Sequence, residues 1–130
     1  MEEVYQFLKK CGVYYLATTE GDQPRVRPFG TVEVFENHLY ILSGKKKDVS
    51  KQIQKNPKVE ICASIGEVWI RITGILERDE RISAKKNMLD KNPHLRVGYS
   101  EDDDNTEVLY FKSGTAVICS LEGEKRTFQL

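Results

Sequence analysis

Residues 13–42 read VYYLATTEGDQPRVRPFGTVEVFENHLYIL, and this stretch decides the fold class. Its β-branched and aromatic residues alternate with polar ones, which is the period of a half-buried strand. Turn-forming residues interrupt the alternation at Glu20-Gly21-Asp22 and again at Glu36-Asn37. The stretch therefore predicts a meander of three strands, over residues 13–19, 25–35 and 39–42.

The rest of the chain has the same character. Further strands are predicted over residues 59–65, 68–76, 106–111, 115–121 and, as a possible last one, 126–130. Three short helices are predicted, over residues 4–11, over residues 48–56, and from an N-cap at Asp79 to Asn92-Pro93. A parallel sheet would need a helix between nearly every pair of strands. We therefore expect a mainly β fold with short peripheral helices, in the form of a small antiparallel barrel.

Length and composition restrict the function classes. At 130 residues the chain is expected to form a single domain over residues 1–130. Twenty basic and twenty acidic residues balance, which disfavours a general nucleic-acid binder. No apolar run is long enough to span a bilayer, and the acidic start Met1-Glu2-Glu3 does not resemble a signal peptide. We expect a cytoplasmic protein without membrane contact, in which Cys62 and Cys119 are buried, reduced thiols.

The common catalytic and phosphate-binding motifs are missing. The chain contains no Gly-x-Gly-x-x-Gly, no Gly-x-x-x-x-Gly-Lys-Ser/Thr and no Gly-x-Ser-x-Gly. His38 and His94 are the only histidines, and neither has a partner at metal-ligand spacing. Both are expected at the surface, no metal site is predicted, and no catalytic residue can be named.

Two basic segments remain as candidate anion sites. Arg25 and Arg27 are two apart on a strand, so their guanidinium groups point to the same face, and the prolines beside them predict an edge strand or a bulge. Such a pair suits an anion, although a solvent-facing basic strand is the alternative. The segment 43–47, Ser-Gly-Lys-Lys-Lys, precedes a helix start, where free amides and lysines suit a phosphate. A solvated loop is the alternative there, and Asp48 would compete for the same amides if it caps the helix.

The third feature is the pair Trp69 and Arg71, which alternation places on one face of a strand. The only tryptophan, next to an arginine, could form a wall for the planar ring of a ligand. The commoner explanation of such a pair is a tryptophan packed in the core beside an arginine at the surface.

Four segments in order carry a family resemblance: TTEGDQPRVRPFG (18–30), LSGKKK (42–47), NPKVEI (56–61) and WIRITG (69–74). Together they resemble the pyridoxamine 5'-phosphate oxidase-like FMN-binding split-barrel family, and most closely its nitroimidazole-resistance branch. The resemblance covers residues 1 to about 121. It implies a six-stranded, antiparallel, Greek-key-like split β-barrel that forms a homodimer with FMN sites at the interface.

The resemblance also implies roles for individual residues. The strand along the isoalloxazine and ribityl chain corresponds to Arg25, Val26, Arg27 and Pro28. The phosphate-binding turn corresponds to Ser43 with one or more of Lys45, Lys46 and Lys47. A flavin-contacting helix position corresponds to Gln52, and the strand that approaches from the neighbouring subunit corresponds to Trp69 and Arg71. The chain departs from the true oxidases in the spacing between its lysines and Asn56-Pro57, and it lacks their C-terminal arginine and histidine pattern, which disfavours vitamin B6 oxidation.

The resemblance favours an FMN-dependent oxidoreductase that reduces small aromatic, quinone or nitro acceptors with NAD(P)H. FMN is expected rather than FAD because a single basic turn neutralises one phosphate. Trp69, Tyr99 and Tyr110 are the possible stacking surfaces for an acceptor. Three alternatives stay open: a non-catalytic flavin-binding sensor or carrier, a deazaflavin-dependent reductase, and an oligonucleotide-binding barrel.

Overall fold

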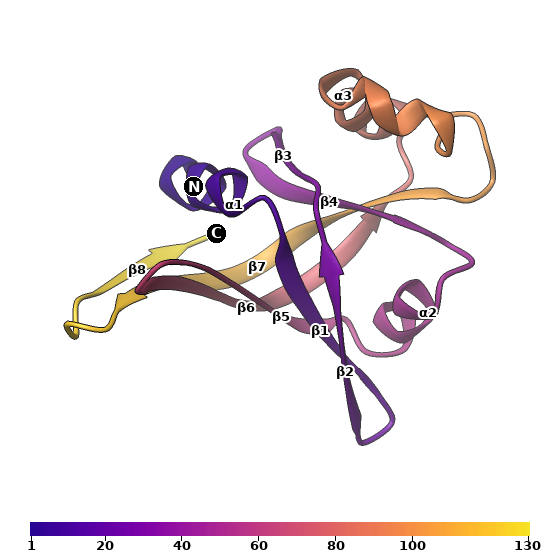
Figure 1. The fold of residues 1–130 in the computed structure, drawn as a ribbon. Coiled ribbons are helices and arrows are strands. Elements are labelled where there is room, and N and C mark those ends of the chain that lie inside the picture. Colours follow the sequence, from indigo (N-terminus) through magenta and orange to yellow (C-terminus); the bar gives the residue numbers. More distant parts are fainter.

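The computed structural model describes all residues from 1 to 130 (Figure 1). Half of the chain lies in eight strands, and three α-helices and one 3-10 helix make up the other regular elements. In chain order the elements are α1 (Glu2–Cys11), β1 (Tyr14–Glu20), β2 (Gln23–Phe29), β3 (Val32–Phe35), β4 (His38–Gly44), α2 (Asp48–Lys55), β5 (Lys58–Ile65), β6 (Val68–Asp79), α3 (Ile82–Lys91), η1 (Pro93–Val97), β7 (Thr106–Ser120) and β8 (Lys125–Gln129).

All eight strands belong to one antiparallel sheet. Its hydrogen-bonded order is β2-β1-β5-β6-β7-β4-β3, and β8 pairs with β7 beside that path. The prediction of a mainly β, antiparallel fold with short helices is confirmed. The sheet has eight strands where the family resemblance implied six, and it is not closed, because β2 and β3 at its two ends do not pair with each other.

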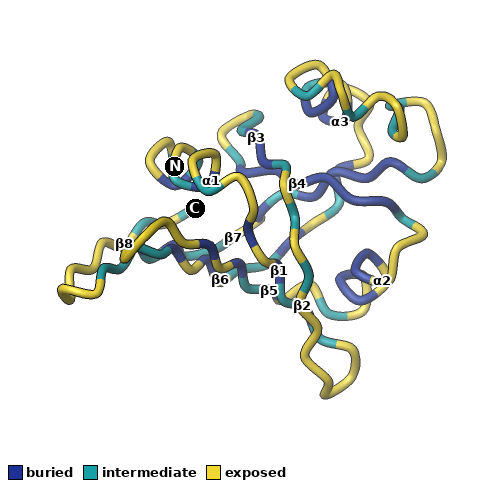
Figure 2. Tube along the Cα trace, in the orientation of Figure 1, coloured by how far each residue is buried: buried dark blue, intermediate teal, exposed yellow.

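One hydrophobic core fills the inside of this sheet. It contains 19 buried residues, contributed by α1, α2 and the strands β1 and β3 to β7 (Figure 2). A smaller core of five buried residues lies under α3: Tyr40, Leu42, Ala84, Met88 and Val108. No helix is both long and apolar enough to cross a membrane. Helix α2 therefore packs on the main core, and α3 packs on the smaller one.

The prediction of one long strand over residues 25–35 is wrong. The chain leaves the ladder at Gly30 and Thr31, so that β2 and β3 become separate strands at opposite ends of the sheet order. Alternation continues across the break, which is why local pattern alone joined the two strands. The prediction of an edge position for the segment with Pro24 and Pro28 is confirmed, since β2 pairs only with β1.

The positions of the helices were predicted more accurately than their N-terminal caps. Asp79 was expected to cap α3, but it is the last residue of β6 and pairs with Val108, and Arg81 occupies the cap position instead. The predicted end of this helix at Asn92 is confirmed. The cap prediction failed because the pairing of β6 with β7 extends the strand three residues beyond the predicted end.

The prediction that Cys62 and Cys119 are buried is also wrong. Cys62 is exposed and Cys119 is half-buried, and no cysteine forms a disulfide. Their neighbours Ile61 and Ile118 are the residues that enter the core. Because successive side chains of a strand point to opposite faces, the buried isoleucines put both thiols on the outer face.

The pairing of β6 with β7 includes a β-bulge. Ile75 pairs with Ser113 and Leu76 with Phe111, so Lys112 is the extra residue. Even-numbered residues of β7 such as Ala116 and Ile118 face the core on one side of the bulge, and odd-numbered ones such as Leu109 face it on the other. The two strands predicted over residues 106–111 and 115–121 are therefore one strand, whose periodicity changes at the bulge.

Beside the bulge the two backbones approach so closely that Gly74 has no room for a side chain. A Cβ there would lie 2.4 Å from the carbonyl oxygen of Ser113 and 2.8 Å from the ring of Phe111. Such distances are far below van der Waals contact, so any larger residue would force the central ladder apart.

We expect Gly74→Ala to destabilise the protein by about 2 kcal/mol or more, since overpacking in a filled interior costs roughly 1–3 kcal/mol. Urea unfolding measures the change. Gly98→Ala is the matched control, because a Cβ at Gly98 meets nothing within 4 Å and its φ is −122°. Equal unfolding midpoints for the two variants would contradict the close approach at Gly74.

Candidate functional site

The edge strand β2 presents its predicted site residues on two different faces of the sheet. Arg25 and Arg27 pair with the buried Thr18 and Leu16, so their side chains start on the inner face. The prediction that the two guanidinium groups share a face is therefore confirmed. Beside them α2 covers the inner face, which makes this end of the sheet polar rather than apolar.

Arg27 is fixed by two side chains that lie far from it in the sequence. Its Nη1 donates to Thr18 Oγ1 at 2.7 Å and its Nη2 donates to Gln52 Oε1 at 2.7 Å. Thr18 Oγ1 also donates to Gln52 Oε1 at 2.6 Å, which closes a triangle of hydrogen bonds between β1, β2 and α2. Partial burial, with a smaller contribution from Arg25, lowers the pKa of Arg27, although an arginine stays charged at neutral pH.

A polar cavity of about 380 Å³ adjoins this triangle. It is lined only by polar residues and a glycine, from the β1–β2 hairpin and from α2: Thr19, Glu20, Gly21, Asp48, Lys51, Gln52, Lys55 and Asn56. Arg25 lies beside the same hairpin and forms an exposed ion pair with Glu20 at 2.8 Å. Of the two arginines, Arg27 is the one held in a fixed direction.

The lysine turn, residues 45–47, lies between β4 and α2, and Asn105 holds its backbone. The amide of Lys45 donates to the carbonyl of Asn105 at 2.7 Å, and the amide of Lys46 donates to Asn105 Oδ1 at 3.0 Å. A Cβ at Gly44 would lie 2.9 Å from the Asn105 side chain. The loop before β7 thus shapes the turn, and all three amides of the turn are already used, since that of Lys47 donates to the carbonyl of Gly44 at 3.0 Å.

The three lysine side chains differ in what they contact. Lys45 Nζ forms an ion pair with Glu80 at 3.0 Å, and Lys47 Nζ lies 3.1 Å from the hydroxyl of Tyr99 and over its ring. Lys46 has no ion-pair partner and is exposed. Lys46 and Lys47 therefore keep an uncompensated charge, whereas that of Lys45 is neutralised.

The start of α2 is open to an anion. Lys47 occupies the cap position and no side chain caps the helix. Asp48, which the sequence offered as a competing cap, lies in the first turn. Amides at the start of a helix that lack side-chain partners attract negative charge.

Ser43 is buried at the end of β4, immediately before the turn. Its side chain is 1% exposed and its Oγ has no hydrogen-bond partner. It lies directly opposite Glu107, whose Oε1 is also buried without a partner while Oε2 pairs with Arg78. A buried hydroxyl without a partner is costly, so the end of β4 is a place where a ligand or an ordered water would be stabilised.

Trp69 and Arg71 share one face, as predicted, but it is the outer face of the sheet. Arg71 is exposed and donates to Glu60 at 2.7 Å, and Trp69 is half-buried. The register aligns Pro28, Tyr15, Cys62 and Arg71 in one row across β2, β1, β5 and β6.

Within one chain, the predicted residues thus form two groups. The inner group is Arg25, Arg27 and Gln52 with the lysine turn, and the outer group is Val26, Pro28, Trp69 and Arg71. Tyr99 and Tyr110 both pack against the core under α3, and of the two only Tyr99 contacts the inner group, through Lys47. The sequence missed Thr18 and Asn105, which hold Arg27 and the turn. Thr18 begins the 18–30 segment that carries the resemblance, but that segment assigned it no role, and Asn105 lies in no motif and reaches the turn only through the tertiary fold.

The histidines lie apart from both groups. His38 is half-buried on β4, His94 is exposed on η1, and no three residues of the His, Cys, Asp or Glu type are placed to hold a metal ion.

Comparisons with known proteins agree with this architecture. The family model described as pyridoxamine 5'-phosphate oxidase matches residues 1–89. A NimC/NimA family protein of Clostridium acetobutylicum has 50% identity and a TM-score of 0.96, over 100% of this chain and 92% of that one. The search of curated proteins gave no match.

More distant structures show the same fold. General Stress Protein 26 of Bacillus anthracis has 17% identity and a TM-score of 0.74, with 98% of each chain covered. A pyridoxamine 5'-phosphate oxidase-related, FMN-binding protein of Nostoc punctiforme has 16% identity and a TM-score of 0.64, over 98% of this chain and 92% of that one. On the family model and the Clostridium relative, the chain belongs to the pyridoxamine 5'-phosphate oxidase family.

Proposed function

We propose that the protein binds FMN and is an oxidoreductase that reduces small aromatic, quinone or nitro acceptors with NAD(P)H. The observation that carries the proposal is the fixed guanidinium of Arg27, held by Thr18 and Gln52 at the exposed edge of the sheet. A cation in a fixed direction suits the polar edge of a flavin, because it stabilises the negative charge that the ring gains on reduction.

The residues of the lysine turn fit the phosphate of FMN. Ser43 offers a buried hydroxyl that lacks a partner, α2 begins without a side-chain cap, and Lys46 and Lys47 keep their charge. These are the donor types that bind a phosphate at a helix start. The chain offers one such turn, which suits the single phosphate of FMN better than the diphosphate of FAD.

FMN would supply the redox chemistry, accepting a hydride from a reduced nicotinamide and passing electrons to an acceptor. The side chains bind and orient: the turn with Ser43 holds the phosphate, Val26 and Pro28 with the arginines of β2 line the ring and ribityl chain, and Gln52 positions Arg27. No side chain is required as a nucleophile or general base, which agrees with the missing catalytic motifs.

We expect Arg27→Ala to weaken FMN binding about ten- to a hundredfold, and Lys45→Ala to weaken it much less. Losing a charge-assisted hydrogen bond costs roughly 1.5–3 kcal/mol, whereas Lys45 already forms an ion pair with Glu80. Fluorescence titration of apoprotein with FMN measures both, with Lys10→Ala on α1 as the control.

Thermal unfolding of each variant separates lost affinity from lost folding. A larger loss of FMN affinity in Lys45→Ala than in Arg27→Ala would contradict this placement of the flavin. If the extracted cofactor were FAD or a deazaflavin, the proposal of FMN would fail even if the site were correct.

We further propose that the functional unit is a homodimer with an FMN site at each end of the interface. The inner and outer groups of candidate residues lie on two faces of one sheet, so Trp69 and Arg71 of one chain do not reach the Arg27 of the same chain. The outer face is also apolar for an exposed surface: Val26 is 69% exposed and Tyr15 is 51% exposed. Burying such a face against a second copy would complete the site.

We expect light scattering to give twice the 15.0 kDa mass of one chain at micromolar concentration. Val26→Asp should shift the protein toward monomer and weaken FMN binding together, because a carboxylate would be buried at the interface. The control is Val97→Asp, since Val97 is 97% exposed on η1, away from the outer face. A wild-type species of 15.0 kDa would refute the dimer.

The activity is tested by anaerobic stopped-flow mixing of the FMN-loaded protein with NADH and with NADPH. We expect the visible flavin absorbance to be lost with at least one donor and restored by a quinone or nitroaromatic acceptor. Broad acceptor use is expected, since a missing contact in a stacking site costs only about 1–3 kcal/mol. Flavin that stays oxidised with both donors would instead support a non-catalytic flavin-binding role.

A further inference from the structure

A second cleft, of about 610 Å³, lies between the β3–β4 hairpin, the end of β6 and the middle of β7. None of its lining residues lines the cavity beside Gln52. Its volume is in the range of small-molecule sites. None of the residues proposed to hold FMN lines this cleft, and of the expected acceptor-stacking residues only Tyr110 does.

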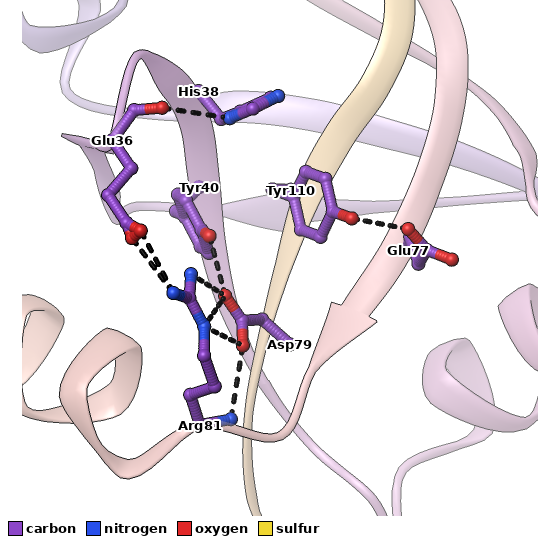
Figure 3. Close-up of polar contacts among 7 residues, drawn as sticks. All are labelled: Glu36, His38, Tyr40, Glu77, Asp79, Arg81 and Tyr110. Atoms are coloured by element: carbon purple, nitrogen blue, oxygen red, sulfur yellow. Dashed lines mark hydrogen bonds and ion pairs between the residues drawn. The ribbon is translucent and has the colours of Figure 1, made fainter.

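Three aromatic rings form one wall of the cleft (Figure 3). The rings of His38 and Tyr110 meet edge to face with centroids 5.0 Å apart, and the rings of Tyr110 and Tyr40 are 5.4 Å apart. Tyr40 is buried, whereas Tyr110 and His38 are half-buried. The hydroxyl of Tyr110 donates to Glu77, which sets the direction of the ring. The two accessible rings stand nearly perpendicular, at 71°, so together they offer a ring face and a ring edge against which a planar ligand can pack.

An ionic network adjoins the aromatic wall at Tyr40. Arg81 pairs with Asp79 and with Glu36, both at 2.9 Å, and Tyr40 donates to Asp79 at 2.6 Å (Figure 3). The hydrogen bond from Arg81 lowers the pKa of Asp79 to about 2, against opposing burial, so this carboxylate is charged at neutral pH. The network joins one arginine to two carboxylates, so this side of the cleft is rigid and carries a net negative charge.

Lys112 is the only cation of the cleft without an ion pair. Arg81 is used by the network, and Arg78 pairs with Glu107 and Glu80. Lys112 is the extra residue of the β-bulge, and it is exposed two residues after Tyr110. Bulges commonly re-aim a side chain beside a binding site, and this one brings an unpaired ammonium to the edge of the aromatic wall.

His38 adds a directional group. Its Nδ1 donates to the backbone carbonyl of Glu36 at 3.0 Å, so in the neutral ring Nε2 is left as an acceptor. The cleft thus offers two accessible aromatic rings, one unpaired cation and one hydrogen-bond acceptor.

We propose that this cleft is a second ligand site, separate from the flavin site, for a small planar aromatic carboxylate. The ring packs against Tyr110 and His38, face to face with one and edge to face with the other, and the carboxylate pairs with Lys112. A ligand with a neutral head group would leave Lys112 unpaired, so the site discriminates by charge. The inference does not depend on the protein's binding FMN.

The test is NMR titration of the protein, as purified with its cofactor, by 4-hydroxybenzoate and by its neutral analogue 4-hydroxybenzamide. The C2–H resonance of His38 should shift with the acid, whereas that of His94, which is exposed on η1, serves as the internal reference. The amide should bind about fivefold more weakly, because an exposed ion pair contributes little more than that factor.

Variants assign the contacts. Lys112→Gln should weaken binding of the acid about fivefold and leave binding of the amide unchanged, and Lys10→Gln on α1 is the matched control. Tyr110→Phe keeps the ring and should bind normally, whereas Tyr110→Leu should bind several-fold more weakly. FMN content should be the same in all four variants.

Three outcomes would overturn the proposal: no shift of the His38 resonance at millimolar acid, equal shifts of His38 and His94, or equal affinity of Lys112→Gln and wild type for the acid. Because Lys112 is exposed, its replacement tests the proposal without threatening the fold. Loss of FMN binding in other experiments would refute the proposed function and leave this result unaffected.

Discussion

The pairing of β6 with β7 is the constraint on which the rest of the structure depends. It joins β5, β1 and β2 on one side to β4 and β3 on the other, and β8 pairs with β7 beside them. The ladder is possible only because Gly74 leaves room for the opposite backbone. The bulge at Lys112 then exchanges the inward and outward positions of β7, so the strand contributes to the main core on both sides of it. Strand pairing of this length would otherwise put half of those apolar residues into water.

The edge strand β2 contributes side chains to both faces of the sheet. Because β2 has a neighbour on one side only, its arginines extend over the polar end under α2 while Val26 and Pro28 extend over the outer face. Alternation along a strand makes this division unavoidable. The proposed flavin would use both sets of β2 residues by lying at the edge of the sheet, and the proposed homodimer would add Trp69 and Arg71 from a second copy. The physical argument for a dimer is thus the same as the argument for the cofactor's position.

Arginines and lysines differ in how often they form ion pairs. Most arginines form ion pairs that hold elements together, as Arg81 does between β6 and the β3–β4 hairpin. Most lysines, in contrast, form no ion pair, and among these only a few lie beside a proposed ligand site: Lys46, Lys47 and Lys112. Unpaired cations beside a hydroxyl or an aromatic ring are more informative about ligands than net charge is, since paired charges have already been neutralised.

The sequence by itself determined the elements of this protein and most of their order. Alternation and turn residues located the hairpins, proline placed β2 at an edge, and ordered short motifs indicated the family. The tertiary structure alone decided which face each residue occupies: it separated β2 from β3, exposed Cys62, and turned two predicted strands into β7. It also brought Gln52 and Thr18 onto Arg27. Local periodicity carries no information on pairing partners or on the phase of a strand relative to the core, because both are set by contacts between residues distant in sequence.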